Sequence, residues 1–198
     1  VADHALRLAY EMDFAFLYDT KSRLFWIGYN LSKGQMDGNH YDLLATEARL
    51  ASLFAIAKAD APPEHWFSFS RPVTQLNGRL SILSWNGSMF EYLMPDLLMR
   101  NYGETLLSET NRAAVCRQIA YGEELGVPWG ISESGYYRLD AQMNYQYRGF
   151  GVPGLGRKRG LGRDLVIAPY ASLLAVGMVP EGVLANVDRL IEEGMLGH

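Results

Sequence analysis

The spacing of hydrophobic positions along the chain predicts a mainly helical fold. Between residues 41 and 59, leucine, phenylalanine and isoleucine recur near the 3.6-residue period with alanine between them, which predicts a helix that Pro62 ends. The N-terminal residues also have a helical pattern. The same reasoning predicts helices over residues 88–100, 108–125, 168–178 and 181–194.

Two short hairpins interrupt this pattern. Residues 14–30 hold two aromatic-rich runs on either side of a polar turn at 19–22, and residues 66–84 contain Asn77-Gly78, the dipeptide favoured in type I′ turns. Residues 127–163 are rich in glycine and have no clear helix or strand period. Long connections of this kind often carry function, so we expect a helical scaffold whose loops form a cleft.

Composition and charge narrow the class of protein. A chain of 198 residues can bury a sizeable core, and no repeat or linker divides it, so we expect a single domain over residues 1–198. With 18 basic and 22 acidic residues the net charge is −4, which argues against a nucleic-acid partner. The sequence begins inside a predicted helix and without methionine, which predicts a piece of a longer polypeptide.

Neither a metal nor a cofactor is indicated. The single cysteine, Cys116, cannot form an internal disulfide, and its place in a predicted helix suggests a small core residue. The four histidines do not have the spacing of metal ligands. Residues 153–163 are glycine-rich and basic but lack the spacing of a phosphate-binding loop. We therefore expect chemistry that relies on side chains alone.

Three glutamates stand in contexts that suit general acid–base work. Glu47, with Asp42 five residues earlier, lies on the first long predicted helix, where solvent exposure is the simpler interpretation. Glu91 is flanked by apolar residues, which would favour the protonated form of a general acid, although a place in the first helical turn after Ser88 explains it equally well. Glu133 stands between two serines in a glycine-rich loop, where no periodicity accounts for a carboxylate.

Aromatic and polar residues gather around these glutamates. Aromatic residues make up 12% of the chain, and their side chains can stack on sugar rings, although most aromatics in any protein are core. The residues that we expect to bind a sugar substrate are Asp42, Trp85, Tyr92, Trp129, Tyr136, Tyr137, Arg138 and Asp140. Tyr145, Tyr147 and Arg148 continue the same polar-aromatic stretch.

Several segments resemble one known family, the glycoamylase-like domain of bacterial cyclic β-1,2-glucan synthases. They are, in order, YDLLATEARLASLFAIAKAD (41–60), SWNGSMFEYLMPDLLM (84–99), VPWGISESGYY (127–137) and PGLGRKRGLGRDLVIAPYASLLA (153–175). The resemblance implies an α/α toroid with its active site in a central cavity. A full ring of about twelve helices needs more residues than this chain has, so an incomplete ring is expected.

The resemblance also implies an activity and a location. It implies a β-1,2-glucan substrate and retaining transglycosylation that closes a linear glucan into a ring. Glu47 and Glu133 are the preferred pair of catalytic carboxylates. Glu91 is the third candidate, because related hydrolases resemble this chain in the segment FEYLMP (90–95) that contains it. The implied parent is a multi-domain protein of the bacterial inner membrane. This domain is expected to be soluble, on the cytoplasmic side, and to meet the membrane only through other domains.

Two other functions fit the same residues. An endo-hydrolase of β-1,2-glucan would use the carboxylates with water as the acceptor, and a non-catalytic module would use them only to bind glucan. The sequence does not assign the nucleophile and the acid/base. An enzyme site predicts that the three glutamates meet on one concave face and that the five aromatic residues named above as sugar-binding border it.

Overall fold

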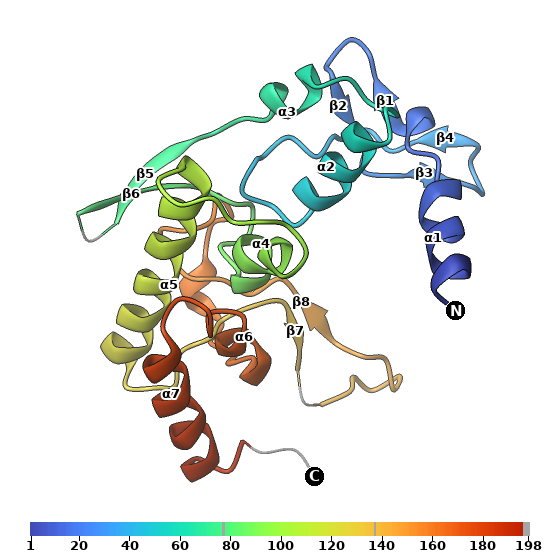
Figure 1. The fold of residues 1–198 in the computed structure, drawn as a ribbon. Helices are drawn as coiled ribbons and strands as arrows, with labels where there is room; N and C mark the ends of the chain where they lie inside the picture. Colours follow the sequence, from blue (N-terminus) through green and yellow to red (C-terminus); the bar gives the residue numbers. More distant parts are fainter. Residues whose placement is uncertain (77, 137, 196–198) are drawn as a thin grey trace. The chain divides into compact units, whose positions relative to one another are not determined.

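The computed structural model describes residues 1–76, 78–136 and 138–195. These residues form two compact units, the first comprising residues 1–44 and 48–70 and the second comprising residues 45–47 and the chain from 71 onward. Helices predominate, and the strands form short antiparallel pairs (Figure 1). The prediction of a mainly helical chain with small hairpins is therefore confirmed.

The first unit is built around a small aromatic core. Its elements are α1 (Ala2–Glu11), the 3₁₀ helix η1 (Ala15–Leu17), β1 (Tyr18–Asp19), β2 (Leu24–Phe25), β3 (Tyr29–Asn30), β4 (Gln35–Met36), α2 (Arg49–Ala57) and α3 (Glu64–Ser68). β1 and β2 form the predicted hairpin, and the Asp19 carboxylate accepts hydrogen bonds from the N–H groups of Lys21 and Ser22 in its turn. Phe25 of β2 packs on the buried ring of His65 from α3, with ring centroids 4.4 Å apart.

Helix α2 is shorter than the sequence predicts. It begins at Arg49, and the residues before it pair with another part of the chain: the Ser70 N–H donates to the Asp42 carbonyl (2.7 Å), and the Leu44 N–H donates to the Ser70 carbonyl (3.1 Å). Because these backbone groups are used between segments, they cannot join a helix. The prediction that Asp42 and Glu47 lie on a helix is therefore wrong.

The second unit holds the remaining elements. They are β5 (Val73–Leu76), β6 (Arg79–Ile82), α4 (Met89–Leu93), the 3₁₀ helix η2 (Met94–Leu97), α5 (Leu106–Leu125), β7 (Ser134–Gly135), β8 (Tyr147–Arg148), the 3₁₀ helix η3 (Leu161–Arg163), α6 (Pro169–Leu173) and α7 (Pro180–Glu192). β5 and β6 form the second predicted hairpin, while Asn77 in its predicted turn lies outside the described residues.

Long helix α5 organises the second unit. Thr105 caps it by accepting the Ser108 N–H, and Gly126 ends it with a left-handed φ of 67°. Helix α5 packs against β6 and α4, and α6 packs against α4 and α7 (Figure 1). The buried face of α5 is rich in small and polar residues, and the polar side chains among them can form hydrogen bonds to neighbouring loops.

Two further predicted helices also prove shorter. The expected helix over residues 88–100 divides into α4 and η2, because Pro95 cannot continue the hydrogen-bond pattern of α4. The one expected over 168–178 is α6 alone. Among the described residues, no helix is both long and apolar enough to cross a bilayer.

Candidate functional site

Two side-chain amides hold the segment that leads to Glu133. Asn186 of α7 accepts the Trp129 N–H and donates to the Trp129 carbonyl, both at 2.9 Å. Gln118 of α5 does the same for Ile131, both at 2.8 Å. Each amide acts as a strand would, pairing with both backbone groups of one residue. An irregular segment is thus fixed in the interior without belonging to a sheet.

Backbone contacts fix the same segment from two further elements. The Met89 N–H at the start of α4 donates to the Ile131 carbonyl (3.1 Å), and the Ala168 N–H before α6 donates to the Gly130 carbonyl (2.9 Å). The Phe90 N–H donates to the hydroxyl of buried Ser132 (3.0 Å). Residues in or next to four helices therefore fix the position of the backbone just before Glu133.

Glu133 lies half-buried at the end of this segment, just before β7. Strand β7 pairs with β8 so that Gly135 lies opposite Tyr147, and the Tyr147 hydroxyl donates a hydrogen bond to the Glu133 carboxylate. The hydroxyl of Tyr170, from α6, reaches the Glu133 carbonyl (2.9 Å) and the Ser132 hydroxyl (3.1 Å). Glu133 is thus held at its side chain by one tyrosine and at its backbone by another.

Glu47 belongs to the same unit and acts on the same phenol. Burial raises the pKa of the Tyr147 hydroxyl well above its usual range, and its hydrogen bond to Glu133 and the charges of Glu133, Tyr170 and Glu47 raise it further. An electrostatic effect of this kind requires nearby charges. Glu133, which bonds to Tyr147, and Glu47, 86 residues earlier in the sequence, therefore both act on the Tyr147 phenol, Glu47 through its charge alone.

Glu91 has a different setting from the other two glutamates. Its side chain is 2% exposed and accepts hydrogen bonds from the hydroxyls of Ser84 and Ser88 and from the N–H groups of Trp85, Asn86 and Ser88, at 2.9–3.2 Å. With Ser88 it forms a complete capping box at the start of α4. The structure therefore does not bring Glu91 to a shared concave face, because its carboxylate closes a buried backbone turn.

Two of the aromatic residues expected to border a cleft are in the core. Tyr92 is 1% exposed, and its hydroxyl bonds to the carbonyls of Ile82 and Leu155. Trp129 is 8% exposed and lies against α5, where its Cβ would be only 2.9 Å from a Cβ built on Gly122. The expectation of sugar contact is wrong for Tyr92, which neighbouring elements enclose, whereas Trp129 also lines a hollow of about 240 Å³ beside α5 and α7, and sugar contact there stays a prediction.

The other predicted sugar-binding residues are accessible to differing degrees. Trp85 is 41% exposed, with the Arg157 guanidinium 5.3 Å above its ring, and half-buried Tyr136 packs edge-on against Phe150. Arg138 is exposed.

Asp140 and Asp42 have local surroundings of their own. Asp140 accepts hydrogen bonds within its own turn from Gln142, Asn144 and Gln146, and these bonds lower its pKa. Asp42 is half-buried in the first unit, and Tyr137 lies outside the described residues.

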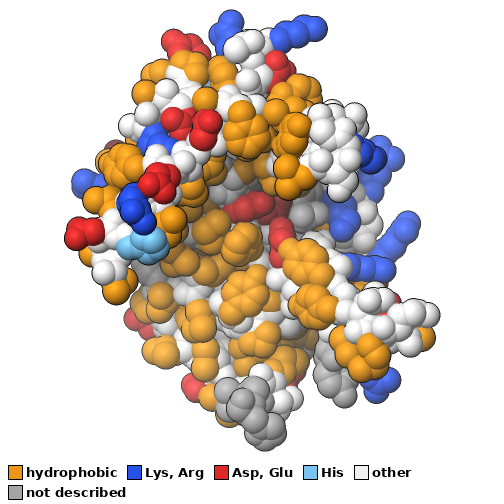
Figure 2. All heavy atoms as spheres, turned by 90° about the vertical axis from the view of Figure 1, so that its right-hand side faces the viewer, with side chains coloured by type: hydrophobic (Ala, Val, Ile, Leu, Met, Phe, Trp, Pro, Cys, Tyr) orange, Lys and Arg blue, Asp and Glu red, His pale blue; other side chains and the backbone are white. Residues whose placement is uncertain are grey.

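A hollow of about 540 Å³ adjoins Tyr147. Its wall carries four basic side chains, of which Arg148 pairs with Asp164 at 2.7 Å. The lining residues are Tyr147, Arg148, Gly149, Phe150, Lys158, Arg159, Gly160, Leu161, Arg163 and Asp164. Many large hydrophobic side chains are also exposed on the chain, as one face shows in Figure 2. The side chain that bonds to Glu133 therefore borders a space open to a ligand.

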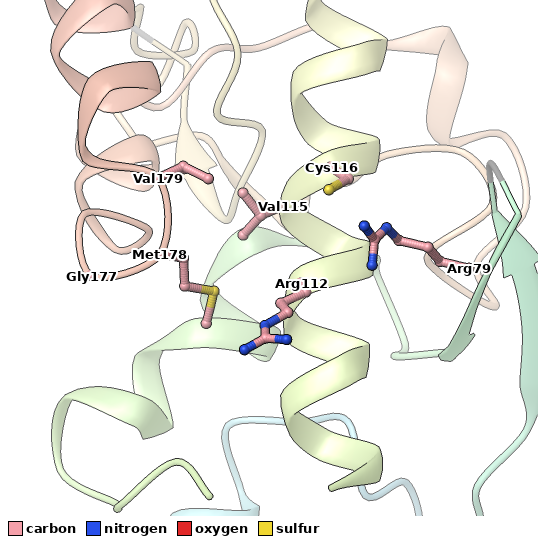
Figure 3. Close-up of a pocket in the computed structure, with 7 residues that line it drawn as sticks. All are labelled: Arg79, Arg112, Val115, Cys116, Gly177, Met178 and Val179. Atoms are coloured by element: carbon pink, nitrogen blue, oxygen red, sulfur yellow. The ribbon is translucent and has the colours of Figure 1, made fainter. Parts of the chain in front are cut away.

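A second hollow, of about 320 Å³, lies on α5 and contains none of the predicted site residues (Figure 3). Arg79 and Arg112 line it together with Val115 and Met178. Cys116 also lines it and is exposed, so the expectation that this cysteine is a core residue is wrong. Cys116 lies on the exposed face of α5, whereas the neighbouring Val115 is buried.

Sequence reasoning missed most of the residues that position Glu133. Gln118 and Asn186 are polar positions on otherwise ordinary helices, and only their burial reveals a role. Tyr170 stands in a hydrophobic run after Pro169. Tyr147 is part of the polar-aromatic stretch noted in the sequence. The composition of that stretch indicated sugar binding but did not single out Tyr147 as the partner of Glu133.

Comparisons with known proteins confirm the resemblance noted in the sequence. Residues 39–197 match the Glycoamylase family model. Over 195 residues the chain is 51% identical to the cyclic β-(1,2)-glucan synthase NdvB of Rhizobium meliloti (strain 1021), an alignment that covers 98% of this chain and 7% of that protein.

A solved structure agrees in fold. The crystal structure of a glucoamylase-like protein from Bacteroides caccae matches 98% of this chain and 49% of its own length, with a TM-score of 0.69 and 17% identity. The chain thus spans about half of that structure and a small part of the synthase. At this low identity the structural match shows similarity of fold alone.

Proposed function

The chain belongs to the Glycoamylase family, and on that basis we propose that it is a carbohydrate-active enzyme domain whose substrate is β-1,2-linked glucan. The observation that carries the proposal is the hydrogen bond from Tyr147 to the Glu133 carboxylate, at a phenol whose pKa the charge of Glu47 also raises. Glycosidases use such pairs of carboxylates, one on each side of the scissile bond. The name of the 51% identical relative supports the choice of glucan.

We assign the nucleophile to Glu133 and the acid/base to Glu47. Tyr147 donates a hydrogen bond to the Glu133 carboxylate, which acts as an acceptor, as a nucleophilic carboxylate would. Glu47 contributes to the same site through its charge. Retention requires the two carboxyl groups to be about 5–5.5 Å apart when the glucan is bound.

The reaction then proceeds in two displacements. A Glu133 oxygen bonds to the anomeric carbon while the glycosidic C–O bond breaks and Glu47 gives its proton to the departing oxygen. In the second step a hydroxyl attacks the same carbon, passes its proton to Glu47 and releases Glu133. When that hydroxyl is the free 2-OH at the other end of the same glucan, a ring forms. When it is that of water, the glucan is hydrolysed.

A wider architecture follows from the same family membership. The helices described here would form part of an α/α toroid, which the 0.69 TM-score to a glucoamylase-like structure supports. The small share of the synthase that the chain covers supports a parent protein with further domains, through which alone this domain would meet the bacterial inner membrane, on its cytoplasmic side.

The products decide between ring closure, hydrolysis and binding alone. Linear β-1,2-glucan is incubated with the full-length protein, and the products are analysed by mass spectrometry and by NMR of the anomeric proton. Cyclisation yields glucans lighter by one water than linear chains of equal length, and hydrolysis yields new reducing ends. A first-formed product of inverted configuration would contradict a nucleophilic Glu133, and binding without either product would leave only a glucan-binding module.

A further inference from the structure

Two tyrosines hold Glu133 from two different elements. Tyr147 comes from β8 and bonds to the carboxylate, whereas Tyr170 comes from α6 and bonds to the backbone carbonyl. We infer that they are positioning residues with separate tasks: Tyr147 orients the Glu133 carboxylate, and Tyr170 fixes the backbone that carries it. The inference rests on the proposed function, in which Glu133 is the nucleophile.

The strand register brings Tyr147 to Glu133. In the β7–β8 pair, Gly135 lies directly opposite Tyr147, and Glu133 is two residues before Gly135. Glu133 lies immediately before β7, so this register brings the long side chain of Tyr147 within reach of the Glu133 carboxylate. A shift of one residue would turn Tyr147 to the other face. The contact is therefore a consequence of the hairpin.

Tyr170 closes a directed chain of hydrogen bonds. The Glu133 carbonyl can only accept, so the single proton of the Tyr170 hydroxyl goes to it. The Ser132 hydroxyl then donates to Tyr170 and accepts from the Phe90 N–H. Because a backbone N–H cannot reverse its direction, each hydroxyl in the chain has one arrangement. The Glu133 backbone is thereby fixed from the first turn of α4.

The charges around the carboxylate favour a protonated Tyr147. Burial and the charges of Glu133, Tyr170 and Glu47 raise the pKa of the Tyr147 phenol. Arg148, the next residue on β8, pairs with Asp164, and Lys158, Arg159 and Arg163 line the hollow that Tyr147 borders. Because the pKa of the phenol is raised with these cations present, Tyr147 keeps its proton at neutral pH and can donate a hydrogen bond to the Glu133 carboxylate.

Two conservative variants separate the tasks. Tyr147→Phe removes only the donor to the carboxylate, and Tyr170→Phe removes only the donor to the backbone. In the full-length protein acting on linear β-1,2-glucan, we expect Tyr147→Phe to lower kcat by about tenfold to a hundredfold while KM and the unfolding temperature stay near their native values. Tyr170→Phe lowers kcat and the unfolding temperature together, because it loosens the backbone. Tyr102→Phe, at an exposed tyrosine, is the control and leaves both unchanged.

Incorporating 3-fluorotyrosine at position 147 gives a second measurement that preserves shape. Its phenol still donates to the Glu133 carboxylate, so kcat stays within about twofold of that of the native protein. If Tyr147→Phe also leaves kcat within about twofold of native while Glu133→Gln is inactive, the inference fails and the proposed function stands. If Glu133→Gln is itself active, the proposed function fails first.

Discussion

The backbone N–H of Phe90 donates a hydrogen bond to the hydroxyl of Ser132, the residue immediately before Glu133. Phe90 stands in the first turn of α4, next to Glu91, whose carboxylate holds that turn closed. Glu91 and Glu133 are therefore connected through Phe90 and Ser132. Glu91 has a structural role in this connection, and Glu133 belongs to the candidate site. The apolar neighbours that made Glu91 resemble a general acid are the surroundings of a structural carboxylate.

Replacing Glu91 tests this structural role. In Glu91→Gln the new amide N–H₂ would face N–H and O–H donors where an acceptor is needed, which leaves buried groups unsatisfied. We expect the free energy of unfolding to fall by about 2–4 kcal/mol, measured by urea denaturation. A variant as stable as the native protein but inactive would instead return Glu91 to the catalytic candidates.

Two helical glycines should respond oppositely to alanine. At Gly122 in α5 an added Cβ would lie 2.9 Å from the Trp129 Cβ and 3.0 Å from the Val127 carbonyl oxygen, so Gly122→Ala should destabilise by about 1–3 kcal/mol. At Gly182 in α7 the nearest atom is 3.8 Å away, so Gly182→Ala should stabilise by about 0.5–1 kcal/mol. Thermal unfolding of both variants measures the difference, and equal shifts would disprove the close packing at Gly122.

Two tryptophans provide a matched test of sugar binding against packing. Trp85 is exposed beneath Arg157, so Trp85→Ala should weaken binding of β-1,2-glucan oligosaccharides about fivefold to tenfold with little loss of stability. Trp129 is buried, so Trp129→Ala should cost about 3–5 kcal/mol of stability. Calorimetric titration and thermal unfolding of each variant separate the two effects. Weak binding by a stable Trp129→Ala variant would reverse the assignment.

Buried His65 should make the first unit sensitive to acid. Its Nδ1–H donates to the Arg23 carbonyl and its Nε2 accepts from the Ser52 hydroxyl, an arrangement of the neutral ring. Burial lowers the pKa of His65, so the unfolded chain binds the proton more tightly and stability falls as the pH drops below about 6.5.

A substitution isolates that pH dependence. Gln at position 65 can donate and accept as the neutral ring does but does not titrate. The unfolding temperature of His65→Gln should therefore change less between about pH 7.5 and pH 5.5 than that of the native protein. An equal change in both proteins would assign the acid sensitivity to other groups.

The sequence predicted which helices and hairpins are present better than the residues at which they begin and end. Periodicity located the helices because each one buries a face, but it could not show that Asp42 and Leu44 use their backbone groups on Ser70 and so leave the helix. The turn at residues 19–22 was recognisable because Asp19 bonds to N–H groups two and three residues away. Local chemistry is visible in a sequence, and pairing between distant segments is not.

The candidate site shows the same limit. Glu133 stood out because no local pattern explained a carboxylate there. The buried side-chain amides of Gln118 and Asn186, which fix the segment before Glu133, bond to residues 13 and 57 positions away in the sequence. Both lie on helices, and the helical pattern gives no sign of these long-range bonds. Tyr92 was misassigned because the residues beside an aromatic side chain in the sequence do not show whether that side chain is buried.

The most direct test of the account is the turnover of linear β-1,2-glucan by Glu133→Gln and Glu47→Gln, with Glu192→Gln at an exposed position as the control. Glutamine keeps the volume of the side chain but can neither attack an anomeric carbon nor transfer a proton. We expect each site variant to lose at least about 10²–10⁴-fold in kcat with an unchanged unfolding temperature, and the control to retain native turnover. A loss below about tenfold in either site variant would contradict a catalytic pair at Glu47 and Glu133.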